Sequence, residues 1–259
     1  QAQTLSTQDS IRVFYDSLLS KLEARYLYRE QVDWAKVRPI AEQATEAASF
    51  AESLNYCTTL FDSIQGSHLN IFSDHGWYKW SQGKEYTRDM FHEEFLKKYE
   101  TEPPFEVSVI DEQYGYIFIP GMLMIDLPQD SINLKTQQMY DEIMQVQAGH
   151  QLKGWIIDLR CNIGGNVFPM LGALYHFLGD NTLYQGIDLD DNITGSAILD
   201  KGVISYVNDS TKVYAEITTS AKPDLEVPVA LLTGILTGSA GELIPISFVG
   251  RPNVTTIGE

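Results

Sequence analysis

The chain has 259 residues, of which 35 are acidic and 18 are basic, so its formal net charge is -17. This length suits one large domain or two small ones, with a core that needs no disulfide. The negative charge would repel phosphate backbones and anionic membranes, which argues against nucleic-acid binding and against binding to a lipid surface. The sequence has no apolar run near the ~20 residues of a membrane-spanning helix, so we expect no membrane span.

The cysteines and histidines indicate no bound metal or cofactor. Cys57 and Cys161 fall in separate segments, form no CxxC motif, and neither require nor exclude a disulfide. The five histidines have no spacing typical of zinc ligands. We therefore expect neither a metal site nor a cofactor.

The two ends of the sequence suggest a processed or shortened start and an end within the natural protein. The first residue is Gln1 instead of methionine, which fits either the removal of a signal peptide or a shortened sequence. The first interpretation favours a periplasmic or secreted protein. At the other end the sequence stops at Glu259, directly after a predicted strand, and we expect the natural protein to continue. The sequence does not indicate an oligomeric state.

Residues 1–66 predict a helical N-terminal domain. Residues 6–51 have the apolar spacing of two helices, and a third helix is predicted over residues 53–64. We expect Gly66 to end this third helix as its C-terminal cap. Apolar residues share one face of the first predicted helix: Ile11, Phe14, Tyr15, Leu18, Leu19 and Leu22.

Residues 67–104 predict connecting strands and a helix. An extended segment begins at Ser67, and a surface helix is predicted over residues 86–99. Pro103 and Pro104 then mark a boundary, because proline ends regular structure. This segment therefore links the helical part to the C-terminal part of the chain.

Residues 105–259 predict an α/β core, because strands and helices alternate there. We predict strands over residues 105–110, 115–119, 154–159 and 227–233, and helices over residues 131–151 and 167–178. Residues 202–207 and 212–218 predict a hairpin, a candidate flap over a cleft. The fold class is therefore α/β (α+β), with a helical N-terminal part followed by an α/β core.

Ser239 stands at the most informative turn of the chain. A predicted apolar strand runs into glycines, and Ser239 then opens a helix. Open α/β sheets place their chemistry at the carboxyl ends of strands, and a helix N-terminus offers unpaired amides to an oxyanion. A serine there could attack a carbonyl group, or it could simply cap the helix. Glu242, three residues on, favours a capping box.

Gly164 and Gly165 form a second turn of the same kind. The strand ending at Leu159 runs into this glycine pair, and a helix follows. The spacing is neither GxGxxG nor GxxxxGK[ST], so a phosphate site is not indicated. Glycines let the backbone turn sharply and bring bare amides close to a ligand, which suits half of an oxyanion hole. Two such turns from one sheet could aim their amides at one point.

A serine nucleophile needs a base, and His68 is the best candidate. It follows a predicted helix cap and starts a predicted strand, with Asn70 on the same face. Imidazole titrates at about pH 6.5 in model peptides, which suits general-base catalysis. A hydrogen-bonded structural histidine is the alternative interpretation.

Three segments in this order resemble one family of serine peptidases. The segments are IIDLRCNIGGN, VALLTGILTGSAGE and GRPNVTTIGE, at residues 156–166, 229–242 and 250–259. The family is that of the tail-specific, or C-terminal processing, peptidases with a crotonase-like (ClpP/crotonase) core. It includes the tricorn core and the interphotoreceptor retinoid-binding modules. The similarity covers residues 105–259, and the helical N-terminal part together with His68 resembles the tricorn-type branch.

The resemblance assigns roles to residues of this chain. It implies that Ser239 is the nucleophile and that His68 is the general base. It also implies that the amide of Ala240 and one amide from Gly164 or Gly165 stabilise the oxyanion. Ser67 matches a residue that helps to orient the histidine in tricorn-like members, although strand alternation would point Ser67 away from His68. The implied partner is a peptide or protein substrate.

The sequence departs from the family pattern in two respects. Members of the other branch use a lysine base shortly after the GE at which this sequence stops, and tricorn-like members place a carboxylate further downstream. Both positions lie past Glu259. In addition, no PDZ-like insert lies between the helical part and the core, so substrate capture by such a domain is not expected.

Three functions remain open at this point. The first is a serine peptidase that uses Ser239 and His68. The second is a non-catalytic module that binds a peptide or apolar ligand on the same fold, because fold alone does not determine function. The third is a crotonase-type enzyme for acyl thioesters, which ranks last because no adenine or pyrophosphate site is indicated.

Overall fold

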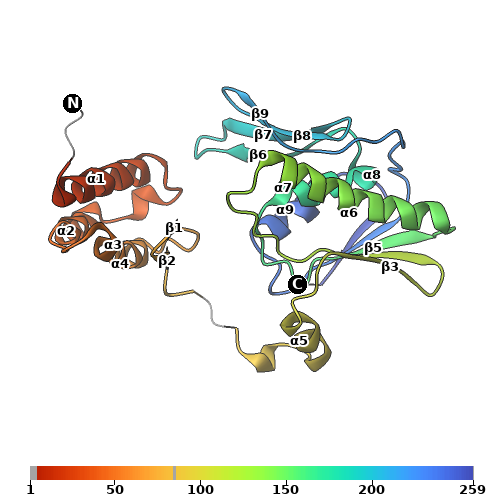
Figure 1. Ribbon diagram of the computed structural model, residues 1–259, viewed down its shortest axis with the longest axis horizontal. Coiled ribbons are helices and arrows are strands. Elements are labelled where there is room, and N and C mark those ends of the chain that lie inside the picture. Colours follow the sequence, from red (N-terminus) through yellow and green to blue (C-terminus); the bar gives the residue numbers. More distant parts are fainter. Residues whose placement is uncertain (1–4, 84–85, 259) are drawn as a thin grey trace. The chain divides into compact units, whose positions relative to one another are not determined.

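A computed structural model describes residues 5–83 and 86–258 of the chain (Figure 1). Residues 1–4, 84–85 and 259, which fall within the predicted segments, lie outside the described residues. Contacts divide the chain into two compact units, the first ending at Met90 and the second beginning at Phe91. Each unit is described by itself.

The first unit consists of helices and one hairpin. Its elements in chain order are α1 (Thr7–Arg25), η1 (Arg29–Gln31), α2 (Trp34–Ala44), α3 (Phe50–Ser53), α4 (Asn55–Ser63), β1 (Asn70–Ser73), β2 (Gly76–Lys79) and η2 (Arg88–Met90). Ser6 caps α1, because its Oγ accepts a hydrogen bond from the Asp9 amide at 3.1 Å. The predicted apolar face of α1 is confirmed: Ile11, Tyr15, Leu19 and Leu22 are buried, and Phe14 and Leu18 pack against the same core.

Two predictions in the first unit need correction. Gln65, with a φ of 55°, takes the left-handed conformation after α4 that was predicted for Gly66. The amide of Gly66 instead donates a hydrogen bond to the carbonyl of Phe61 at 2.8 Å. Ser67 and His68 lie in a turn, and strand β1 begins only at Asn70. The strand alternation that was expected to point Ser67 away from His68 therefore does not apply.

The second unit is built from two sheets with helices between them. The five-stranded sheet has the order β11-β10-β5-β4-β3, with every pair parallel except β3 and β4. Its strands are β3 (Glu106–Ile110), β4 (Tyr114–Phe118), β5 (Gly154–Asp158), β10 (Val229–Leu232) and β11 (Val254–Ile257). The strands predicted in the core are thus confirmed within two residues at each end. The central strand β5 is buried on both faces, as a parallel strand covered by helices must be.

The second sheet is antiparallel and has the order β6-β7-β8-β9. Its strands are β6 (Asn181–Ile187), β7 (Ile193–Asp200), β8 (Val203–Val207) and β9 (Thr211–Glu216). The predicted hairpin is the β8–β9 half of this sheet. Strand β9 packs on helices in the core of the unit, so the hairpin is not the separate flap that was suggested.

Helices fill the layer between the two sheets (Figure 1). They are α6 (Gln129–Gly149), α7 (Val167–Ala173), α8 (Tyr175–Leu178) and α9 (Ala240–Ser247), while α5 (Glu93–Glu100) precedes the sheet. Helix α6 contacts β3 and β4 on one side and β9 on the other. The predicted helix over residues 167–178 breaks at Leu174 into α7 and α8. The predicted helix over residues 86–99 is instead the short 3-10 helix η2 followed by α5.

The structure agrees with the predicted fold class, a mixed α/β protein with a helical N-terminal part. Cys57 and Cys161 are both free and buried, and they lie in different units. Within residues 5–83 and 86–258, no helix combines the length and apolar character that crossing a bilayer requires.

Candidate active site

Both glycine turns leave the same edge of the five-stranded sheet. Strands β5 and β10 are adjacent and parallel, and Asp158 at the end of β5 pairs with Leu232 at the end of β10. Each strand therefore delivers its turn, and then a helix, to the carboxyl edge of the sheet. This is the edge at which open α/β sheets bind their ligands.

Ser239 has an unusual backbone conformation at the start of α9. Its φ is 55° and its ψ is -118°, in a region that side chains larger than glycine seldom occupy. Its amide donates a hydrogen bond to Glu242 Oε2 at 2.8 Å, which supports the predicted capping role of Glu242. The side chain of Ser239 makes no capping hydrogen bond, and the residue is exposed. The turn thus presents an uncommitted hydroxyl at the surface.

Gly164 brings the first turn into contact with Ser239. A β-carbon at Gly164 would lie 2.7 Å from Ser239 Cβ and 3.2 Å from Ser239 Oγ. A β-carbon at Gly165 would overlap the backbone of Met122. Both glycines have positive φ values, 112° and 114°, which glycine adopts without strain. Gly164 is therefore required for the approach of the two turns, and Gly165 for the approach of the Met122 backbone.

Asn162 holds the two turns together. Its side chain is fully buried, and its Oδ1 accepts a hydrogen bond from the Gly164 amide at 3.0 Å. Its backbone carbonyl accepts a hydrogen bond from the Gly238 amide at 3.0 Å. Thr237 adds a third link, because its Oγ1 donates to the carbonyl of Leu159 at 2.9 Å. Asn162 was not among the predicted site residues, and its place between a strand and a glycine pair was the only available signal.

The amides around Ser239 differ in whether they are already hydrogen-bonded. The Gly164 amide donates to Asn162 Oδ1, and the Ser239 amide donates to Glu242 Oε2. Those of Gly165 and Ala240 have no acceptor among the described residues. Ala240 is buried and directly follows Ser239, and the exposed Gly165 follows the glycine that contacts Ser239, so their two free amides form a suitable site for an oxyanion. Of the two glycines left open by the sequence, Gly165 has the available donor.

An ion pair between a buried carboxylate and an exposed arginine lies at the base of the first turn. Asp158 is 1% exposed, and its carboxylate accepts hydrogen bonds from Arg160 Nε at 3.0 Å and from Arg160 Nη2 at 2.7 Å. Burial alone would raise the pKa of Asp158, but hydrogen bonds from Arg160 and Tyr116 outweigh it and lower the pKa below its usual range. Asp158 is therefore a carboxylate that fixes the start of the turn.

The predicted base lies in the first unit. Ser67 and His68 are both exposed, in a turn closed by a hydrogen bond from the Leu69 amide to the Gly66 carbonyl at 2.8 Å. Asn70 Nδ2 donates to the backbone carbonyl of His68 at 3.1 Å. The structure thus brings together four of the predicted site residues, Ser239, Gly164, Gly165 and Ala240, in the second unit. The pairing of His68 with Ser239 stays a prediction.

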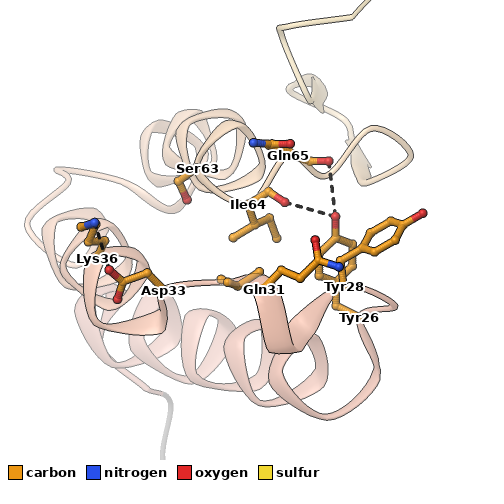
Figure 2. A pocket seen from close by; sticks show the side chains of 9 residues that line it. Tyr26, Tyr28, Gln31, Asp33, Lys36, Ser63, Ile64 and Gln65 are labelled. Atoms are coloured by element: carbon orange, nitrogen blue, oxygen red, sulfur yellow. Dashed lines mark hydrogen bonds and ion pairs between the residues drawn. The ribbon is translucent and has the colours of Figure 1, made fainter. Parts of the chain in front are cut away.

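The first unit also contains a pocket of about 410 Å³, which Figure 2 shows. The hydroxyl of Tyr26 points to one side of it and donates to the carbonyls of Ile64 and Gln65 at 3.1 Å and 3.3 Å. Neither Ser239 nor His68 lines this pocket. Across the part of the chain that the structure describes, no cluster of three or more metal-ligating side chains is present either.

The chain is similar to several known proteins. The nisin-resistance protein of Lactococcus lactis subsp. lactis is 24% identical over 255 residues, which are 98% of this chain and 69% of that protein. A lipoprotein from Streptococcus agalactiae has a similar structure, with a TM-score of 0.66, 22% identity and coverage of 99% of this chain and 77% of that chain. A crystal structure from Parabacteroides merdae gives a TM-score of 0.55 with 16% identity, over 97% of this chain and 75% of that chain.

The similarity to the Streptococcus agalactiae and Parabacteroides merdae structures supports the mixed α/β fold. The sequence model of peptidase family S41 matches residues 113–259, a segment that contains both glycine turns and Ser239. Since this segment is more than half of the sequence, the chain belongs to peptidase family S41.

Proposed function

We propose that this protein is a serine peptidase that cleaves peptide bonds with Ser239 as its nucleophile and His68 as its general base. One observation carries the proposal. The uncommitted hydroxyl of Ser239 lies against Gly164, and the neighbouring amides of Gly165 and Ala240 have no acceptor among the described residues. A nucleophile beside paired amide donors is the arrangement that acyl transfer requires.

The first half of the reaction forms an acyl-enzyme. His68 accepts the hydroxyl proton while Ser239 Oγ attacks the carbonyl carbon of the scissile peptide bond. The electron pair of the carbonyl moves to its oxygen, and the amides of Gly165 and Ala240 donate hydrogen bonds to that oxyanion. When the tetrahedral intermediate collapses, the C–N bond breaks. The departing amine takes the proton from His68, and an ester remains on Ser239.

The second half regenerates the enzyme. A water molecule attacks the ester carbonyl, and His68 accepts the proton of that water. The oxyanion forms again between the same two amides. Its collapse breaks the bond to Ser239 Oγ, which regains a proton from His68. A carboxylic acid product is released, and the protons balance over the whole cycle.

The proposed base comes from a different unit than the nucleophile. Ser67 is adjacent to His68 in the exposed turn, and we propose that it orients the imidazole. The Gly164 amide is engaged by Asn162, so Gly165 is the proposed oxyanion donor of the pair. The helical first unit and the histidine in it also support the tricorn-type branch over the lysine-dependent branch of tail-specific peptidases.

The proposed substrate is a peptide or protein outside the cytoplasm. One relative is named for resistance to nisin, and another is named a lipoprotein. Both names are consistent with action beyond the cytoplasmic membrane. The net charge of -17 favours the approach of cationic peptides over anionic ones.

Cleavage of a defined peptide mixture tests the proposal. The wild-type chain and the Ser239→Ala variant would be incubated with peptides of varied sequence, and the products identified by mass spectrometry. We expect new termini with the wild type and none with Ser239→Ala. Peptide binding by both proteins without cleavage by either would reject the peptidase and favour a binding module on the same fold.

A further inference from the structure

Lys98 and Tyr116 form a relay that ends at the base of the first glycine turn. We infer that these two side chains are positioning residues of the proposed peptidase site, which act through Asp158 on the turn that carries Gly164 and Gly165. The inference rests on the proposed function for its catalytic consequence. Lys98 lies before the segment that the family model matches, residues 113–259.

The relay consists of two short hydrogen bonds. Lys98 Nζ donates to the hydroxyl oxygen of Tyr116 at 2.7 Å. The hydroxyl of Tyr116 then donates to Asp158 Oδ2 at 2.8 Å. Since the ammonium group has no acceptor function, the tyrosine proton must point to the carboxylate. The direction of both bonds is therefore fixed.

The surroundings of the relay keep it in place. Lys98 is half-buried, and its ammonium group lies 4.0 Å from the centre of the Phe118 ring and 5.0 Å from that of the Tyr116 ring. Burial and the neighbouring carboxylate of Asp158 raise the pKa of Tyr116, so the phenol stays protonated and keeps its role as a donor. One buried carboxylate is thus held from two sides, by Arg160 and by Tyr116.

Asp158 transmits this constraint to the glycine turn. Its Oδ1 accepts a hydrogen bond from the Arg160 amide at 3.1 Å, which shapes the first residues after β5. The next carbonyl, that of Leu159, accepts hydrogen bonds from the Asn162 amide at 2.8 Å and from Thr237 Oγ1 at 2.9 Å. Asn162 then holds the Gly164 amide, which leaves the Gly165 amide free. A shift at Asp158 would therefore move the proposed oxyanion donor.

The chain offers matched pairs of residues for the test. Tyr116→Phe removes only the hydroxyl of the relay, whereas Tyr114→Phe removes an exposed hydroxyl from the same strand. Lys98→Met removes the relay cation and keeps an unbranched side chain. Lys97→Met removes the preceding cation, which is exposed and pairs with Glu93 at 3.2 Å.

Kinetics provide the first readout, with a peptide that the wild type cleaves. We expect Tyr116→Phe and Lys98→Met to lower kcat by about 10-fold or more, with KM changed by less than about 2-fold, because small misplacement of a donor weakens mainly the transition state. Lys98→Arg should recover most of the loss, since it restores a donor. Tyr114→Phe and Lys97→Met should match the wild type. Equal kcat in all variants, even with lower thermal stability, would overturn the inference.

Amide hydrogen exchange provides a second readout that needs no hydrolysis. In the full chain, we expect exchange over residues 160–166 to be at least about 10-fold faster in Tyr116→Phe and Lys98→Met than in the wild type and the two controls, because local opening governs exchange. Unchanged exchange over this segment would reject the relay. If the wild type cleaved nothing, the proposed function would fail, yet the exchange rates would still decide whether the relay positions the turn.

Discussion

The turn that carries Ser239 and the turn that carries His68 are held in different ways. The first lies in the second unit, where Asn162, Thr237 and Glu242 tie it down with named hydrogen bonds. The second lies in the first unit, is exposed, and among the described residues is held only by hydrogen bonds between near neighbours: from the Ser67 amide to Gln65, from the Leu69 amide to Gly66 and from Asn70 Nδ2 to His68. Stabilisation of an oxyanion depends on fixed donors, whereas a base needs only to reach one proton. Under the proposed function, the second unit supplies the nucleophile and the fixed oxyanion donors, and His68 of the first unit is the proposed base.

Removal of the proposed nucleophile should have the largest effect on the rate of peptide cleavage. We expect Ser239→Ala to lower the rate of peptide cleavage by about 10⁴-fold or more, because no other group can form the ester. Initial rates by mass spectrometry measure this loss. Thermal unfolding is the control, since the hydroxyl makes no capping hydrogen bond and its removal should leave the midpoint unchanged. Retained cleavage by a folded Ser239→Ala protein would place the nucleophile elsewhere.

Removal of the base tests the other half of the comparison. We expect His68→Ala to slow cleavage by about 10³-fold, in the range of lost general-base catalysis. The fold should not change, because His68 is exposed. His75 is a matched control, since it is also exposed and belongs to the same unit. His75→Ala should keep full activity, and equal activity of the two variants would remove His68 from the mechanism.

A methyl group at the glycine pair should damage both activity and stability. In Gly165→Ala the new Cβ would overlap the Met122 backbone, and a φ of 114° disfavours alanine. We expect a loss of about 1–3 kcal/mol in the free energy of unfolding from the strained backbone and about a 100-fold loss in kcat from the displaced amide. Chemical denaturation and steady-state kinetics measure the two effects.

Gly149→Ala is the control for this substitution, because a β-carbon there would meet no atom within 4 Å. It should be neutral or slightly stabilising. A Gly165→Ala protein with wild-type kcat would show that the proposed donor is not required.

Replacement of a buried histidine, His176, should have the smallest effect, a change in how the stability of the second unit depends on pH. His176 is 5% exposed, and neither ring nitrogen has a hydrogen-bond partner among the described residues. Burial lowers its pKa, and nearby Arg251 lowers it further, although Asp224 opposes both. The folded pKa is therefore below the unfolded one, so its contribution to stability is present at neutral pH and is lost as the pH falls below about 6.5.

His176→Phe should reduce the loss of thermal stability on acidification by a few degrees. The ring of Phe177 already packs edge-on against His176 at 5.1 Å, so an apolar ring fits there. Thermal unfolding between neutral and mildly acidic pH measures the effect. His150→Gln is the control, because His150 is exposed and should leave the pH dependence as in the wild type. An identical acid response in all three proteins would remove His176 as its source.

The sequence was informative where the fold is locally determined. The strands of the parallel sheet are buried on both faces and therefore appear as short apolar runs, such as Trp155–Ile156–Ile157. Strand β6 was missed, because Gln185 and Gly186 interrupt its apolar alternation and its pairing with β7 is irregular. The turns of Ser239 and the glycine pair were predictable, because each directly follows an apolar strand, at the edge where α/β sheets place their chemistry.

The remaining parts of the site depend on contacts between distant residues. Lys98 is separated from Tyr116 by 18 positions, and Tyr116 from Asp158 by 42. No local pattern of residue types indicates such a relay.

Covalent labelling with a fluorophosphonate probe tests the central claim most directly. The probe phosphonylates only an activated serine, and peptide mapping by mass spectrometry identifies the residue. The account predicts a label on Ser239 in the wild type and a rate of labelling about 10³-fold lower in His68→Ala, because the base no longer removes the hydroxyl proton. A folded wild-type protein that carries no label, or carries it on another serine, would contradict the account.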